Sequence, residues 1–147
     1  MKVTQSINYD EVKDYIRNSS KESAVYVGVD SQQYRKFSKF ALAIIVHIDS
    51  SHGAKVFVET YTCDRIKEMK VRLMKEVELV VNASMKLVDV VGKRKFEVHI
   101  DINPNPEYKS NSVSKEAVGY VTGMGLNCIV KPYSFAATHA ADAICKH

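Results

Sequence analysis

The segment AVYVGV, residues 24–29, is the feature that most restricts how this chain can fold. It is apolar throughout and lacks the alternation of polar and apolar side chains that a half-exposed strand shows. A strand of this kind is buried on both faces, so the fold needs helices on each side of a sheet. At 147 residues the chain has the length of one domain. We expect a single domain over residues 1–147, in which residues 1–23 form a short helix and a lead-in.

The rest of the chain supplies further strands and then helices in alternation. Apolar or alternating patterns predict strands at 39–48 and 54–61, after a polar loop at 31–38. From Arg65 to Val91 apolar residues recur at helical spacing, so we expect one long helix that Asp64 caps and Gly92 ends. The remaining patterns predict a helix at 8–18, a strand at 95–100, a helix at 114–123, a strand at 126–131 and a helix at 134–146.

This order, β-β-β-α-β-α-β-α behind a short N-terminal helix, predicts an α/β fold. Three antiparallel strands followed by two right-handed crossovers give a mixed five-stranded sheet with helices on both faces. Two of its strands run directly into an aspartate, Asp30 after residues 24–29 and Asp101 after residues 95–100. Ligand sites in such sheets lie beyond the carboxyl ends of the strands. If these strands are parallel neighbours, the two carboxylates lie within about 6 Å and favour Mg²⁺ or Mn²⁺, which prefer oxygen ligands.

These features together resemble the ribonuclease H-like superfamily. Over residues 8–146 the chain looks more closely like the YkuK-like family of predicted ribonuclease-H-like proteins, in the segments VYVGVDSQ, KEVELVV, VHIDINPNP and KPYSFAATHAAD. The resemblance implies a ribonuclease-H-like mixed sheet, and it makes Asp142, in the closing THAADAIC, the last metal ligand. It also implies a carboxylate from the long helix.

Two glutamates of the long helix, Glu76 and Glu78, can fill that place. Comparison with the glutamate motif of ribonucleases H favours Glu78. Helical angle favours Glu76, which lies roughly 70° from the middle of the apolar stripe, against roughly 130° for Glu78. We expect Glu78 to be the ligand, and Glu76 to face solvent and pair with Arg72.

The predicted function is therefore a metal-dependent nuclease that cleaves phosphodiester bonds. Its metal-binding and catalytic residues are expected to be Asp30, Glu78, Asp101 and Asp142, with Asp30 bridging two Mg²⁺ or Mn²⁺ ions. The alternative is a non-catalytic nucleic-acid-binding domain with the same fold and an incomplete metal site. ATP-binding relatives of this fold need a glycine soon after the first aspartate, and here Ser31, Gln32 and Gln33 follow it.

The expected partner is nucleic acid, whether RNA, DNA or a hybrid. The net charge of +4 is compatible with a polyanion, and the loop from Arg35 to Lys39 places basic residues next to Tyr34 and Phe37. No apolar run reaches the roughly 20 residues that span a membrane, and the first residues lack the apolar core of a signal peptide. We therefore expect no membrane association and a cytoplasmic location. The three cysteines have no zinc-site spacing, and an odd number argues against a disulfide framework.

Overall fold

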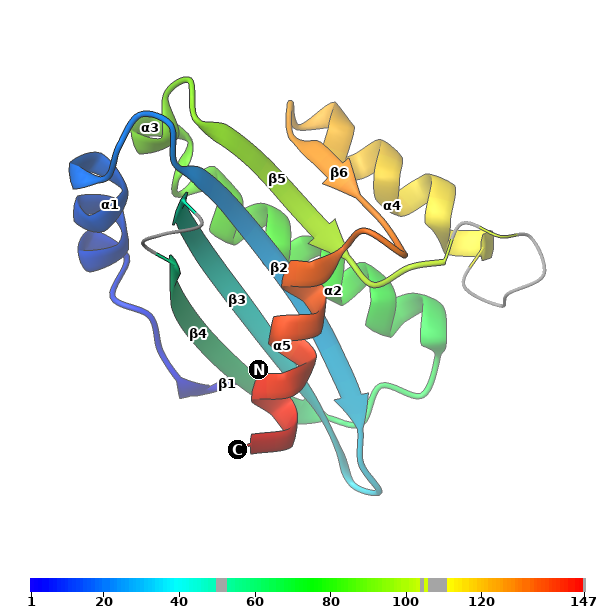
Figure 1. Ribbon diagram of the computed structural model, residues 1–147. Helices are drawn as coiled ribbons and strands as arrows, with labels where there is room; N and C mark the ends of the chain where they lie inside the picture. Colours follow the sequence, from blue (N-terminus) through cyan, green and yellow to red (C-terminus); the bar gives the residue numbers. More distant parts are fainter. Residues whose placement is uncertain (50–52, 104, 106–110, 147) are drawn as a thin grey trace.

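The computed structural model describes residues 1–49, 53–103, 105 and 111–146. These residues form a six-stranded sheet in the order β1-β4-β3-β2-β5-β6 (Figure 1). The first four strands in this order pair antiparallel, whereas β2, β5 and β6 pair parallel. The bounds are β1 Lys2–Gln5, β2 Ala24–Gln33, β3 Phe37–Asp49, β4 Gly53–Asp64, β5 Lys95–Ile100 and β6 Asn127–Ile129. The predicted mixed α/β fold is confirmed, with one strand more than expected.

The additional strand is β1, in the segment that the sequence analysis treated as a lead-in. Its four residues are all exposed, so no alternation of apolar and polar side chains marks it as a strand. Backbone pairing with β4 defines this edge strand instead, with Val3 opposite Tyr61. Sequence patterns detect burial, and an edge strand without burial leaves no such pattern.

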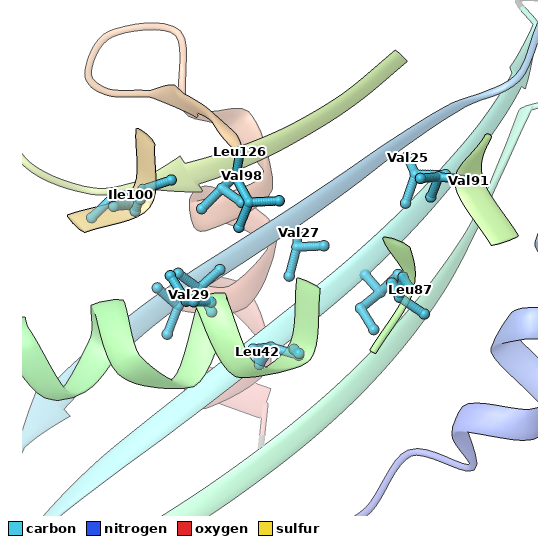
Figure 2. Packing of buried hydrophobic residues seen from close by; sticks show 14 of the residues in the cluster. Val25, Val27, Val29, Leu42, Leu87, Val91, Val98, Ile100 and Leu126 are labelled. Carbon is cyan, nitrogen blue, oxygen red and sulfur yellow. The ribbon is translucent and has the colours of Figure 1, made fainter. Parts of the chain in front are cut away.

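Helices cover both faces of the sheet, as expected. The bounds are α1 Tyr9–Asn18, α2 Met69–Met85, α3 Val88–Val91, α4 Asn111–Gly123 and α5 Phe135–Lys146. In Figure 1, α5 crosses one face and α2 lies on the opposite one, with α4 beside α2. The larger hydrophobic core lies between the sheet and α1 to α4, and Figure 2 shows part of it, with β2 residues Val25, Val27 and Val29 among Leu42, Leu87, Val91 and Val98.

The single long helix predicted from Arg65 to Val91 is wrong at its start and near its end. Asp64 ends β4, and α2 begins only after Glu68, which has an extended backbone. Near the other end the buried Ser84 hydroxyl donates to the Val80 carbonyl at 2.7 Å, and the Leu87 amide donates to the Ser84 carbonyl at 2.9 Å. This tighter turn separates α2 from α3. Gly92, at φ 56°, ends α3 as expected.

The predicted polar loop at 31–38 is also wrong. β2 continues past Asp30 to Gln33, and a tight turn leads straight into β3 at Phe37. Ser31 and Gln33 pair opposite Phe40 and Ser38 in the antiparallel ladder. The polar side chains misled the prediction, because Ser31 and Ser38 are buried although they are polar.

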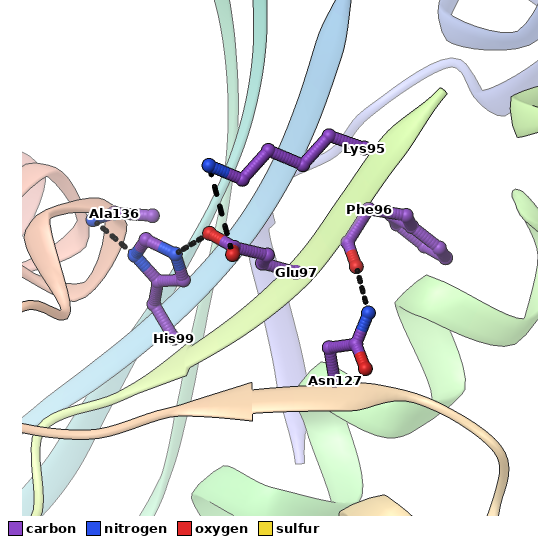
Figure 3. Close-up of polar contacts among 6 residues, drawn as sticks. All are labelled: Lys95, Phe96, Glu97, His99, Asn127 and Ala136. Atoms are coloured by element: carbon purple, nitrogen blue, oxygen red, sulfur yellow. Dashed lines mark hydrogen bonds and ion pairs between the residues drawn. The ribbon is translucent and has the colours of Figure 1, made fainter. Parts of the chain in front are cut away.

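Helix α5 approaches the sheet closely at Gly28. A Cβ added at Gly28 would lie 2.1 Å from the carbonyl carbon of Ala136, so only glycine fits there. His99 of β5 fixes the same end of α5, since its Nδ1 accepts a hydrogen bond from the Ala136 amide at 3.1 Å (Figure 3). Its Nε2 lies 3.2 Å from Glu97 Oε1. Because Nδ1 must accept, the neutral imidazole carries its proton on Nε2 and donates it to Glu97.

Gly28→Ala is therefore expected to lower the free energy of unfolding by about 1–3 kcal/mol, since α5 must shift away from β2. Urea denaturation of the two proteins measures this. Gly119→Ala is the matched control, because a Cβ at Gly119 meets nothing within 4 Å and its backbone needs no positive φ. Equal destabilisation by both substitutions would contradict this account of the packing.

In the described part of the chain, no helix combines the length and the apolar character that a membrane span requires.

Candidate functional site

Asp30 and Asp101 occupy neighbouring positions, where the parallel pairing of β2 with β5 ends. The two strands are parallel, and Val29 is paired with Ile100, directly before the two aspartates. Asp30 follows Gly28 by two residues, so it lies on the face of the sheet that α5 covers. The predicted adjacency of the two strands is confirmed. Asp101 is 35% exposed, and Lys131 Nζ lies 3.2 Å from its Oδ1.

Asp30 is in an unfavourable environment for a charged carboxylate. Burial raises its pKa to about 6, and the neighbouring Asp101 carboxylate contributes to the increase. The Ser31 backbone amide, Arg72 and Lys131 lower the pKa of Asp30, but these effects do not compensate for burial. A positive charge between Asp30 and Asp101 would remove the repulsion.

Glu76 of α2 reaches the same strand end from the opposite face. Its side chain is only 1% exposed. The Ser31 hydroxyl donates to Glu76 Oε2 at 2.6 Å, while Arg72 Nη1 donates to the Ser31 oxygen at 2.8 Å. Ser31, the residue that follows Asp30, therefore links the Glu76 carboxylate to the Arg72 guanidinium.

The Glu76 carboxylate is the most perturbed group at this end of the sheet. Burial and, to a smaller extent, the charge of Asp30 raise the pKa of Glu76 to about 8, although Ser31 and Arg72 act to lower it. Its second oxygen, Oε1, is buried without a hydrogen-bond partner among the described residues. A buried carboxylate oxygen without a partner is costly, and it is a free ligand position for a cation.

The orientation expected for the two helix glutamates is wrong. Glu78 is exposed and pairs with Lys75 at 3.3 Å, whereas Glu76 is buried beside Ser31. Residues two apart on a helix point roughly 200° from each other, so only one of them can face the strand ends. The helical angle indicated the glutamate that faces the strand end, and the motif comparison indicated the one that faces solvent. The expected pairing of Glu76 with Arg72 is also replaced, because Arg72 donates to Ser31.

Asp142 faces away from the sheet that carries Asp30 and Asp101. Helix α5 packs on the sheet through Ala136, Ala140 and Ala143, all buried. Asp142 is two residues after Ala140, so it lies on the outward side of α5 and is exposed. Its role as a ligand stays a prediction from the resemblance.

The donor set suits a hard divalent cation, although the side chains do not form a complete cage. Within residues 1–49, 53–103, 105 and 111–146, no three His, Cys, Asp or Glu side chains are arranged to hold a metal ion. Mg²⁺ rarely needs such a cage, since one or two carboxylates, several waters and substrate phosphates commonly complete its octahedron. Asp30, Asp101 and the free Glu76 oxygen provide oxygen donors of this kind.

Three supporting residues of the site were missed by the sequence analysis. Ser31 was assigned to a loop, Arg72 was expected to pair with Glu76, and Lys131 was placed in a strand without a role. A strand alternation that continues past Asp30 would have placed Ser31 on the α2 face. Nothing local predicts Lys131 beside Asp101, because the contact depends on where the chain leaves β6.

Comparison with known proteins agrees with this geometry. Residues 8–146 match the family model described as ribonuclease H-like. The chain is also 26% identical to the "Uncharacterized protein YkuK" of Bacillus subtilis (strain 168), over 93% of this chain and 88% of that protein. No solved structure gives a significant match. The chain therefore belongs to the ribonuclease H-like family.

Proposed function

We propose that this protein is a nuclease that hydrolyses phosphodiester bonds with Mg²⁺ or Mn²⁺ held by Asp30, Asp101 and Glu76. The observation that carries the proposal is that Asp30 and Asp101 directly follow the last paired residues of β2 and β5, and that their charges act on the buried Glu76 of α2. Burial and mutual repulsion raise the pKa of Asp30 to about 6 and that of Glu76 to about 8. Such perturbation in a cluster is typical of functional carboxylates.

The residues around the carboxylates have distinct parts in this proposal. A divalent cation would supply positive charge at the reacting phosphate oxygens and lower the pKa of a bound water. Ser31 fixes the orientation of Glu76 through its hydroxyl, and Arg72 fixes Ser31. Lys131 balances Asp101 at 3.2 Å, and its partly exposed ammonium would be free to contact a substrate phosphate. Asp142 is retained as the fourth ligand predicted from the resemblance.

A non-catalytic nucleic-acid-binding protein is the second candidate. It is favoured by the ion pair between Lys131 and Asp101, which already satisfies one carboxylate without a metal. It is also favoured by the incomplete convergence of ligands among the described side chains. The two candidates predict different results in one experiment: a nuclease cleaves nucleic acid when a divalent metal is present, whereas a binding protein does not.

The deciding experiment incubates the purified protein with labelled single-stranded, duplex and hybrid substrates in Mg²⁺, in Mn²⁺ and in EDTA. We expect cleavage with metal, none in EDTA, and loss of activity in Asp101→Asn. Asp142→Asn in the same assay tests the remaining ligand position. Cleavage that persists unchanged in Asp101→Asn, or no cleavage of any substrate by the parent protein, would refute the nuclease proposal.

A further inference from the structure

The face of the sheet beyond Asp30 is covered by α5 only in part. In the antiparallel register Asp30 lies opposite Ala41, and Gln32 lies opposite Lys39. Since side chains two apart share a face, Lys39 lies diagonally next to Asp30 on the α5 side. The same face continues onto β4 through Thr60 and Thr62. Here a hollow of about 440 Å³ is lined by Thr4, Gln5, Tyr34, Phe37, Lys39, Thr60 and Thr62. We call these seven residues the hairpin surface.

Two aromatic rings stand at the edge of the hairpin surface. Tyr34 and Phe37 stack on each other with ring centroids 4.6 Å apart and planes 11° from parallel. They are 37% and 38% exposed, so their outer faces remain available. The turn that carries them is fixed, because the Tyr34 amide donates to the Phe37 carbonyl at 2.8 Å and Arg65 donates to the Tyr34 carbonyl at 2.8 Å. The platform is therefore formed before any ligand binds.

The charge around the hairpin surface is mostly positive. Lys2, Arg35 and Lys36 are exposed, and Lys39, only 8% exposed, lines the hollow itself. None of these four cations forms an ion pair with any side chain in the described ranges. Asp64 is the acidic residue at the rim, in the adjoining hollow that also includes Lys2. Unpaired cations beside exposed aromatic rings complement a ligand with phosphates and flat bases.

We propose that the hairpin surface binds single-stranded nucleic acid that continues from the phosphate at Asp30 and Asp101. This inference rests on the proposed function and names its substrate class. Phosphates would contact Lys39, Arg35 and Lys36, and a base would stack on the outer face of the Tyr34–Phe37 pair. A duplex is disfavoured, because its bases are stacked on each other and do not present their faces to a protein ring.

The test measures binding in EDTA, so that it does not depend on cleavage. Fluorescence anisotropy is recorded with a labelled single strand of about 12 nucleotides, within the length that one binding surface of this kind covers, and with a duplex of the same sequence. Tyr34→Ala is expected to weaken binding of the single strand on the order of ten-fold, and Tyr34→Trp to retain it. Arg35→Ser with Lys36→Ser should weaken binding and reduce the salt slope by about 0.7 per removed cation.

Matched controls keep this test separate from general charge and from folding. Tyr120→Ala removes an aromatic side chain that is 45% exposed on α4, on the opposite face of the sheet, and should leave binding unchanged. Lys21→Ser with Lys93→Ser removes two exposed cations near the other end of β2, and should have little effect. Equal affinity for strand and duplex, or Tyr34→Ala binding like the parent, would overturn the inference. If either of these results is found together with metal-dependent cleavage, only the binding inference fails and the nuclease proposal stands. If the expected binding is found without any cleavage, the nuclease proposal fails and the binding inference stands.

Discussion

Asp30→Asn is expected to reduce metal-dependent cleavage on the order of a thousand-fold while leaving the fold intact. The substitution keeps the size of the side chain and one oxygen, but it removes the negative charge that would hold the cation against the reacting phosphate. Initial rates at saturating Mn²⁺ for the parent and variant give the ratio directly. Asp14→Asn, which removes an exposed carboxylate of α1 paired with Arg17, is the control and should keep full activity.

The same substitution should stabilise the protein without metal. Because the folded pKa of Asp30 is raised to about 6, ionisation is less favourable in the folded protein than in the unfolded chain. Stability from this group is therefore lost as pH rises from about 4 to 6. Asp30→Asn should gain about 1 kcal/mol above pH 6, after allowance for solvent screening, and nothing below about pH 4.

Metal should reverse the order of stability. Mg²⁺ or Mn²⁺ should raise the melting temperature of the parent protein and leave that of Asp30→Asn nearly unchanged, because only a bound cation stabilises the folded state. Equal metal-induced shifts for both proteins would show that Asp30 is not a ligand, whatever the outcome of the cleavage assay.

Most of the fold could be predicted because burial leaves a readable pattern. The all-apolar β2 segment demanded cover on both faces, and the structure provides α2 on one and α5 on the other. Features that depend on contacts between distant segments were missed. β1 is defined only by pairing with β4. The break between α2 and α3 depends on the buried Ser84 and on the burial of Leu87 in the core.

The sequence predicted the two aspartates of the site correctly as neighbours, but not the orientation of the helix glutamates. The positions of Asp30 and Asp101 followed from strand ends, since parallel neighbours align their carboxyl ends. The orientations expected for Glu76 and Glu78 were wrong because a short motif was preferred to helical geometry. The role of Asp142 as a ligand stays a prediction from the motif match, which says nothing about which side of α5 faces the sheet. Geometry on a helix is the stronger guide when the apolar stripe is clear.

Glu76→Gln is expected to reduce cleavage by orders of magnitude, whereas Glu78→Gln should leave it close to the parent value. Glu76 is buried beside Ser31, and one of its carboxylate oxygens has no hydrogen-bond partner among the described residues. This oxygen would be able to bind the cation together with Asp30 and Asp101. Glu78 is more than half exposed and its ion pair with Lys75 lies in solvent. Parallel turnover measurements at saturating Mn²⁺ compare the two variants under identical conditions.

Stability provides an independent readout of the same pair. The folded pKa of Glu76, raised to about 8, lies well above the value near 4.5 of an unfolded glutamate. The folded protein thus retains a proton that the unfolded chain releases, and the free energy of unfolding falls as pH rises between these values. Glu76→Gln lacks this titration, and its glutamine oxygen can still accept from Ser31. Denaturation at about pH 5 and about pH 8 should show a gain of about 2 kcal/mol or more at the higher pH and far less at the lower one.

Glu78→Gln should follow the parent at both pH values, because its charge is screened by water in either state. If Glu78→Gln is instead the inactive variant, α2 must rotate from the position seen here when substrate and metal bind. If both variants cleave normally while Glu76→Gln alone flattens the pH profile, Glu76 is a buried acid of structural importance only. The metal would then rest on Asp30 and Asp101, with water and substrate phosphates as its remaining ligands.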